Sequence, residues 1–332
     1  MSSNESRINP ARPDQSEPDI PEPAALRVLH ESEVLAEEID ALGHMNVRFY
    51  GTRALASTDR LLAELAVETD DFGTTSPFVY DLPRLFTRYQ REQHTGAPLV
   101  VSGGLLEANE QGLRFYHELR NPERDELAAS FVQDLSLRSP GDEEPLSIPT
   151  SVCKALAKSV IEFPIQGQPR TVDLDRDPVA PTLEEALSGG LAFRIPRKVD
   201  PADCDPEGRL TPIMRPFYMW GGDPLPPATK QDGPMLIELP DGAKMGWASM
   251  ETRSVMVEQP MAGMRVQSFA ATVEIARKTN LRRYWVFNLD TQELMLSNEV
   301  VELALHLGER RAIEIPDDIR ASMSADLRAD LR

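Results

Sequence analysis

The residues best suited to chemistry lie together in the stretch Asp40-Ala41-Leu42-Gly43-His44-Met45-Asn46. A carboxylate such as Asp40 can act as a nucleophile or a general base, and the imidazole of His44 can transfer protons near neutral pH. Backbone N–H groups at the start of a helix can stabilise a negative charge that develops on a substrate oxygen. A structural interpretation stays open beside this one, because Gly43 suits a tight turn and Asn46 is a good N-cap.

Two predicted elements flank this stretch and would position it. Residues 34–39 form a short extended run before it. Residues 47–67 follow it, and their apolar residues recur at helical spacing while charged residues fall on the other face. This pattern predicts an amphipathic helix of several turns with one buried face. The apolar positions are Tyr50, Ala54, Leu61, Leu62 and Leu65.

After this helix the pattern changes to the alternation that is typical of half-buried strands. It is clearest where Leu113, Phe115, His117 and Leu119 alternate with polar or aromatic residues, and similar runs cover 99–106 and 127–137. Turn sequences separate the three runs, and a short helical segment is expected at 150–159. One long helix followed by an antiparallel meander indicates an α+β fold.

Composition limits the classes of function. The chain has 332 residues and a formal net charge of −19, from 54 acidic and 35 basic residues. This balance disfavours non-specific binding to nucleic acid or to an anionic membrane. No apolar run reaches the ~20 residues of a membrane helix, the N-terminus lacks the order of a signal peptide, and the two cysteines suggest no disulfide framework. We therefore expect a soluble cytoplasmic protein that has neither a nucleic-acid nor a membrane partner.

The order of elements repeats after a segment rich in proline and glycine. The matched residues lie 165 to 168 positions apart along most of the chain, a collinear series that indicates tandem duplication. The matched segments are Asp40-Ala41-Leu42-Gly43 with Asp205-Pro206-Glu207-Gly208, Gln93–Pro98 with Gln259–Met264, 112–116 with 280–284, Ser130 with Ser297, and Ile148-Pro149 with Ile315-Pro316.

These motifs resemble those of the hotdog-fold thioesterases, in particular the 4-hydroxybenzoyl-CoA thioesterase group. One branch of that family has the pattern D-x-x-G-H-M-N-N-x-x-Y, which the stretch 40–50 matches except at Val47, in the place of the second Asn. Another branch has D-C-D-P-x-G, which Asp203-Cys204-Asp205-Pro206-Glu207-Gly208 matches throughout. The resemblance covers most of residues 26–158 and 191–320.

The resemblance implies a tandem (double) hotdog, in which each half is an antiparallel β-sheet wrapped around a central α-helix. The expected divisions are a disordered tail at 1–25, hotdog domains at 26–158 and 191–322, a linker at 159–190 and a C-terminal tail at 323–332. A linker of ~30 residues is long enough to cross the molecule. Each chain would form a pseudo-dimer, and further assembly into a homo-oligomer stays open.

The resemblance also implies hydrolysis of an acyl thioester by a motif carboxylate. Asp40 and Asp205 are then the candidates, and we favour Asp40, because several prolines after Asp205 must shorten or break the equivalent helix. For His44 we favour a positioning role over proton transfer, and for Asn46 a capping role. No cofactor is required, and the remaining histidines lack the spacing of metal ligands.

The expected substrate is a thioester of coenzyme A or of acyl carrier protein. The densest basic cluster, which could bind the phosphates of coenzyme A, is Arg277, Lys278, Arg282 and Arg283, on a predicted turn between strands. A solvated turn is the alternative. Phe217, Tyr218, Met219 and Trp220 would line the pocket or belong to the core. Two rival functions are a non-catalytic acyl-ligand binding protein and a hotdog hydratase or dehydratase.

Overall fold

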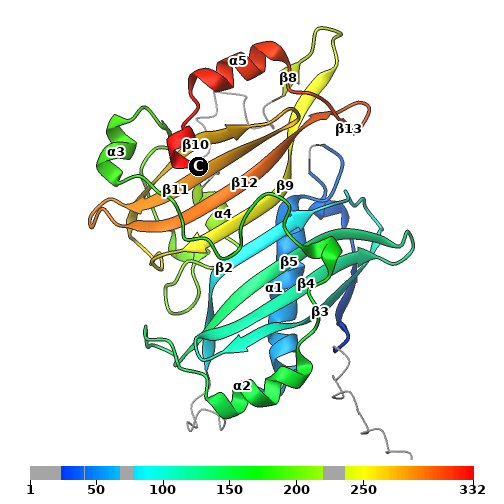
Figure 1. Cartoon of the computed structure of the whole chain (residues 1–332), viewed down its shortest axis with the longest axis vertical. Coiled ribbons are helices and arrows are strands. Elements are labelled where there is room, and N and C mark those ends of the chain that lie inside the picture. The colour runs from blue at the N-terminus through cyan, green and yellow to red at the C-terminus, as the bar shows by residue number, and fades with distance from the viewer. Residues whose placement is uncertain (1–23, 41, 68–77, 220–235) are drawn as a thin grey trace, which may run out of the picture.

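One antiparallel β-sheet runs through both halves of the protein (Figure 1). The computed structural model describes residues 24–40, 42–67, 78–219 and 236–332. The strands of the first half are β1 (Arg27–Glu33), β2 (Val79–Tyr89), β3 (Pro98–Asn109), β4 (Gly112–Asn121) and β5 (Glu126–Arg138). Those of the second half are β6 (Ala192–Phe193), β7 (Arg197–Lys198), β8 (Ile237–Glu238), β9 (Lys244–Met256), β10 (Arg265–Ile275), β11 (Thr279–Asn288), β12 (Leu294–His306) and β13 (Arg311–Ala312).

The strand order has the symmetry of a two-fold pair. It reads β1-β3-β4-β5-β2 in the first half and β9-β12-β11-β10-β6 in the second, so each strand of the first half has a counterpart in the second. The short strands β7, β8 and β13 of the second half pair with β10, β9 and β12, off this path. β2 and β9 meet in the middle as antiparallel neighbours, with Thr87 opposite Thr252. The two halves therefore join edge to edge into one continuous sheet, as two identical subunits would in a dimer.

Helix α1 (Val47–Glu64) packs against the strands of the first half and lies behind them in Figure 1. It begins where predicted, because the Asn46 side chain accepts a hydrogen bond from the Arg48 N–H at 3.0 Å. Its buried face includes Tyr50, Ala54 and Leu61, which confirms the predicted amphipathic helix.

The described part of the equivalent helix in the second half is short. Helix α4 (Arg215–Met219) has five residues and packs against β10, β11 and β12. Residues 220–235 lie outside the described part of the chain. Pro212 lies in the turn before this helix, and Pro216 is its second residue, where proline is compatible with a first helical turn. The predicted shortening of this helix stays a prediction.

Backbone hydrogen bonds repeat between the halves, which supports the duplication. Met45 donates to the carbonyl of Gln93 at 2.8 Å, and Leu210 donates to the carbonyl of Pro260 at 2.8 Å. Within the two Asp turns, the glycine N–H bonds back to the Asp carbonyl in both cases. Gly43 and Gly208 have φ of +83° and +80°, a region that side chains disfavour, so both turns require glycine.

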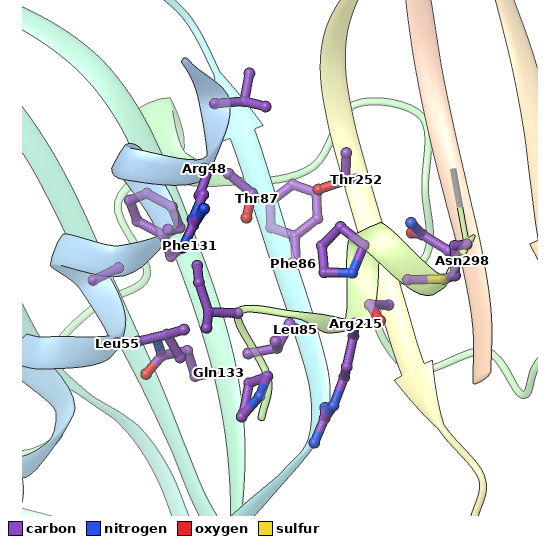
Figure 2. Close-up of a pocket in the computed structure, with 18 of the residues that line it drawn as sticks. Arg48, Leu55, Leu85, Phe86, Thr87, Phe131, Gln133, Arg215, Thr252 and Asn298 are labelled. Carbon is purple, nitrogen blue, oxygen red and sulfur yellow. The ribbon is translucent and has the colours of Figure 1, made fainter. Parts of the chain in front are cut away.

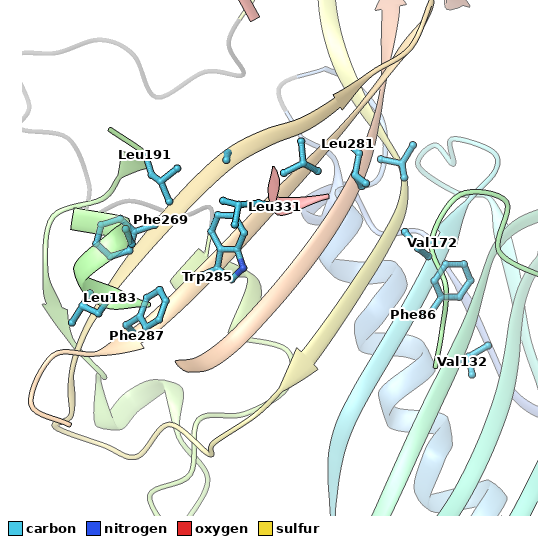
Figure 3. Packing of buried hydrophobic residues seen from close by; sticks show 14 of the residues in the cluster. Phe86, Val132, Val172, Leu183, Leu191, Phe269, Leu281, Trp285, Phe287 and Leu331 are labelled. Carbon is cyan, nitrogen blue, oxygen red and sulfur yellow. The ribbon is translucent and has the colours of Figure 1, made fainter. Parts of the chain in front are cut away.

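The segment 159–190 crosses the face of the sheet opposite α1 (Figure 1). It contains the 3-10 turn η4 (Ile165–Gly167) and helix α3 (Leu183–Ser188). Its Val172 and Leu183 pack in one cluster with Phe86 of β2 and Trp285 of β11, spread across both halves in Figure 3. The segment expected as a linker is thus also a cover that holds the halves together.

The prediction of a C-terminal tail at 323–332 is wrong. Helix α5 (Asp317–Ala325) extends into this segment, and the 3-10 turn η6 (Ala329–Leu331) follows it. Leu331 is buried in the same cluster as Trp285, so burial of its side chain orders the chain end. The remaining helical segments are α2 (Thr150–Leu156), η1 (Ala36–Glu38), η3 (Ala157–Ser159) and η5 (Pro201–Asp203).

A buried histidine makes stability depend on pH. His117 on β4 is fully buried, and this burial lowers its pKa to about 4. The unfolded chain, with an ordinary histidine pKa near 6.5, binds the proton first as pH falls. The stability that neutral His117 contributes is therefore retained above pH 6.5 and lost between pH 6.5 and pH 4. We expect a loss of about 2 kcal/mol from pH 7 to pH 5 through this residue.

Urea denaturation of the wild type and of His117→Gln at both pH values checks this expectation. Between pH 7 and pH 5 the free energy of unfolding should fall by about 2 kcal/mol less in the Gln variant than in the wild type. Equal pH slopes for the two proteins would contradict the assignment.

Candidate active site

The turn that begins at Asp40 holds its carboxylate beside an imidazole. Asp40 Oδ1 accepts a hydrogen bond from the Leu42 N–H at 2.8 Å, and the Asp40 N–H donates to the carbonyl of His44 at 2.9 Å. Asp40 Oδ2 lies 3.5 Å from His44 Nδ1. The carboxylate is thus fixed by its own turn, and its second oxygen faces the imidazole.

A second carboxylate lies on the other side of the same imidazole. His44 Nε2 is 3.7 Å from Glu92 Oε1, so His44 stands between two acidic groups. Arg310, from the second half, pairs with Glu92 at 3.3 Å and donates to the carbonyl of Leu42 at 2.7 Å. The second half therefore holds the Asp40 turn in place. Glu92 was missed at the sequence level because it belongs to no motif and only the fold brings it to His44.

An apolar cavity of about 390 Å³ lies between the two halves, directly beyond the helix entrance (Figure 2). Helix α1 forms one side, residues 212–219 form the other, and β2 and β9 form the floor. Its volume is in the usual range of small-molecule sites. The lining includes Asn46, Val47, Arg48, Gly51, Ala54, Leu55, Leu85, Phe86, Thr87, Tyr89, Phe131, Gln133, Pro212, Ile213, Arg215, Pro216, Phe217, Met219, Thr252, Ser254 and Asn298.

The first turn of α1 forms one end of this cavity. Asn46 and Val47 line it, whereas Asp40 lies in the turn before the helix and is not a lining residue. The first N–H groups of a helix have no acceptor within the helix and carry partial positive charge. This end of the cavity therefore suits a developing negative charge. Asn46 has its predicted capping role.

The aromatic segment of the second half is divided between cavity and core. Phe217 and Met219 line the cavity, as expected for a pocket wall. Tyr218 is buried elsewhere, where its hydroxyl donates to Asp203 Oδ2 at 2.7 Å. Trp220 lies outside the described residues.

Asp205 occupies the same turn geometry but has a different partner set. Its Oδ1 accepts hydrogen bonds from the N–H groups of Glu207 and Arg209, each at 2.9 Å. Arg209 stands where the first half has His44, and it pairs with Asp81 at 2.8 Å. Glu207 pairs with Arg138 of β5 at 2.7 Å. The second turn is thus tied into an ion-pair network that joins the halves.

Asp205 nevertheless lines a second cavity, of about 420 Å³, between its turn and the middle of α1. Arg209 and Gln259 also line it. The side chain of Arg215 lines both cavities and is buried. Burial lowers the pKa of Arg215 to about 10, still far above neutral pH, so the guanidinium is charged.

The basic cluster expected to bind phosphates does not form a site. Arg277 and Lys278 lie between β10 and β11, where Arg277 pairs with Glu314 at 3.2 Å. Arg282 and Arg283 belong to β11, not to the turn, and neighbouring strand residues face opposite sides of a sheet. Arg283 is buried and pairs with Glu299 at 2.8 Å, so its assignment to phosphate binding is wrong.

Solved structures of similar fold are thioesterases. The putative oleoyl thioesterase from Lactobacillus plantarum is 11% identical with a TM-score of 0.59, over 85% of this chain and 97% of that one. The 12:0-ACP thioesterase from Umbellularia californica is 10% identical with a TM-score of 0.60, over 83% and 93%. An acyl-ACP thioesterase from Bacteroides thetaiotaomicron is 10% identical with a TM-score of 0.55, over 83% and 97%. No curated protein sequence matches the chain.

The fold class is therefore a tandem hotdog, as the sequence predicted. Among the described residues, only the first half has a full-length central helix. Residues 34–156, which contain the Asp40 turn, match the model of the thioesterase-like superfamily. Within the described part of the chain, no helix has the length and apolarity needed to cross a membrane.

Proposed function

We propose that the protein hydrolyses an acyl thioester, with the acyl group in the apolar cavity and the thioester carbonyl at the first turn of α1. The observation that carries this proposal is the position of the cavity. It opens onto the helix entrance that the Asp40 turn builds, and this turn lies within the residues that match the thioesterase-like superfamily.

Asp40 is the proposed reacting carboxylate. As a nucleophile it would attack the carbonyl carbon and expel the thiolate, which takes up a proton, and water would then hydrolyse the resulting anhydride. As a general base it would instead take a proton from a water molecule that attacks the same carbon. Both routes yield free acid and thiol, and the partial positive charge at the start of α1 would stabilise the oxyanion in either.

His44 is the proposed positioning residue for this carboxylate. Its place between Asp40 and Glu92, at 3.5 Å and 3.7 Å, supports a role in orienting Asp40. The equivalent position in the second half is Arg209, which pairs with Asp81. We therefore assign the reaction to the first half and a structural role to the turn at Asp205.

Release of free thiol from a panel of thioesters tests the proposal. The panel holds straight-chain, branched and aromatic acyl groups on coenzyme A and on acyl carrier protein. We expect turnover of at least one member, with acid and thiol formed in equal amounts. Tight binding of a thioester without release of thiol would instead identify a non-catalytic acyl-ligand binding protein. Formation of a hydrated or dehydrated thioester would identify a hydratase or dehydratase.

The proposed setting is the cytoplasm. Cys153 and Cys204 are both free thiols, and free thiols suit a reducing compartment.

A further inference from the structure

The two walls of the apolar cavity differ in chemistry although the repeat makes them equivalent. Leu85 on β2 and Phe131 on β5 line it from the first half. At the positions 167 residues later the second half has Thr252 and Asn298, which line the same cavity. Ser254, two residues after Thr252, also lines it. At these two positions the duplication has replaced apolar side chains by polar ones, while Thr87 and Gln133 of the first half and Ile213 and Phe217 of the second also line the cavity. We call Arg215, Thr252, Ser254 and Asn298 the polar wall of the cavity.

Arg215 is the charged member of the polar wall. It takes the position of Tyr50 in the first half, and only 2% of it is exposed. Its Nη1 donates to the carbonyl of Leu82 at 2.5 Å. Within the described part of the chain, its Nε has no hydrogen-bond partner and no carboxylate lies within ion-pair distance.

Two further polar atoms of this wall are unsatisfied. Ser254 Oγ and Asn298 Oδ1 are buried and have no hydrogen-bond partner among the described residues. Buried polar groups in folded proteins are almost always paired, so each such group needs an explanation. Here Ser254, Asn298 and Arg215 all line one cavity, which points to a ligand as their common partner.

The charge of Arg215 indicates that this ligand is an anion. A buried charge without a counter-ion is costly, because the protein interior solvates it poorly. The carboxylate of Asp81 acts on Arg215 from a distance, but its Oδ2 already accepts from Arg138 at 3.1 Å and from Arg209 at 2.8 Å. The guanidinium of Arg215 therefore lacks an anion of its own.

Figure 2 shows Arg48 and Arg215 at opposite ends of the cavity. Arg48 belongs to the first turn of α1, where the thioester is proposed to sit. Arg215 is then placed to meet the far end of an acyl chain. Between them lie apolar side chains such as Leu55 and Phe131, which suit methylene groups.

We infer that the acyl group carries a carboxylate at its far end, bound by the Arg215 guanidinium. The substrate class is thus the monothioester of a dicarboxylic acid. This inference rests on the proposed function for the placement of the thioester, but the binding of the carboxylate requires no reaction.

Binding of non-hydrolysable thioether analogues tests the inference apart from hydrolysis. The probes are the analogues of suberoyl-CoA, its methyl ester and octanoyl-CoA, measured by calorimetry on the full chain. We expect the suberoyl analogue to bind about 10- to 100-fold more tightly than the other two, the range expected for a charge-assisted hydrogen bond. Arg215→Met should abolish this preference, and Arg215→Lys should retain part of it.

Two results would overturn the inference. One is equal or tighter binding of the methyl ester or the octanoyl analogue by the wild type. The other is an equal loss of affinity for all three probes in Arg215→Met, together with a lower melting temperature. That result would show that Arg215 has only a structural role, through its hydrogen bond to the Leu82 carbonyl. We expect that variant to melt at the same temperature or higher, because it loses a buried charge that has no counter-ion.

The matching thioesters separate this inference from the proposed function. A preference for the suberoyl analogue without release of thiol from suberoyl-CoA would overturn only the proposed function. Release of thiol from suberoyl-CoA and octanoyl-CoA with equal kcat/KM would overturn only the inference. Failure of all three analogues to bind, both on coenzyme A and on acyl carrier protein, would overturn both.

Discussion

Replacing Asp40 by Asn is expected to lower kcat for thioester hydrolysis about 1,000-fold or more, because the amide can neither attack the carbonyl nor take a proton from water. The fold should survive. Asn can still accept the hydrogen bond that Leu42 donates to Asp40 Oδ1 at 2.8 Å, and the carboxylate makes no ion pair with Lys or Arg in the described part of the chain. Single-turnover release of thiol measures the effect on the chemical step.

Asp205→Asn is the matched control, because Asp205 occupies the same position in the second turn and uses the same type of hydrogen bond. We expect its kcat to stay within about 10-fold of the wild type. If the Asp205 variant loses activity and the Asp40 variant retains it, the reaction belongs to the second cavity, where Asp205 is a lining residue.

His44→Gln separates orientation from proton transfer in the same assay. A positioning role predicts a smaller loss of kcat than Asp40→Asn, with an unchanged shape of the pH profile. The disappearance of one limb of that profile would instead show that the imidazole itself carries a proton.

Replacing Glu299 by Gln is expected to cost about 3 to 5 kcal/mol of stability. This carboxylate lies between two buried guanidinium groups, with Arg253 and Arg283 each at 2.8 Å. The amide would leave both positive charges without a counter-ion in the interior. Urea denaturation measures the loss, and the midpoint should fall without a change in slope.

The exposed pair Arg277 and Glu314 provides the control. Their side chains are 73% and 62% exposed, so Glu314→Gln should change stability by less than about 1 kcal/mol. A second test replaces all three buried partners, Arg253, Glu299 and Arg283, by apolar residues. This triple variant should recover much of the loss, because it leaves no buried charge unpaired. A triple variant that is no more stable than Glu299→Gln would contradict this explanation.

The buried arginines explain why the basic cluster of the second half was misassigned. In sequence, Arg282 and Arg283 look like solvated charges near a turn. In the fold, the segment that crosses the sheet supplies a carbonyl group to Arg283. Arg283 donates to the carbonyl of Val179 at 3.1 Å, and Trp285 donates to the same carbonyl at 2.9 Å. Sequence patterns do not indicate which distant carbonyl group will accept a hydrogen bond from a strand residue.

The polar wall of the cavity could have been found earlier from the repeat alone. An offset of 165 residues places Arg215 at Tyr50, and one of 167 places Asn298 at Phe131. Such substitutions of apolar or aromatic residues by polar ones mark where two duplicated halves have diverged. That these residues face one cavity, and that their polar atoms lack partners there, required the structure.

The sequence by itself determined the duplication, the long helix of the first half, the antiparallel meander that follows it and the two Asp turns. These features depend on local propensity, on hydrophobic period and on glycine at positive φ, all of which act over a few residues. Only the tertiary structure decided what those elements meet. It brought Glu92 and Arg310 to the turn at Asp40 and placed Arg215 in the cavity between the halves. Such contacts join residues far apart in sequence, where the packing of whole sheets, and not local preference, fixes the geometry.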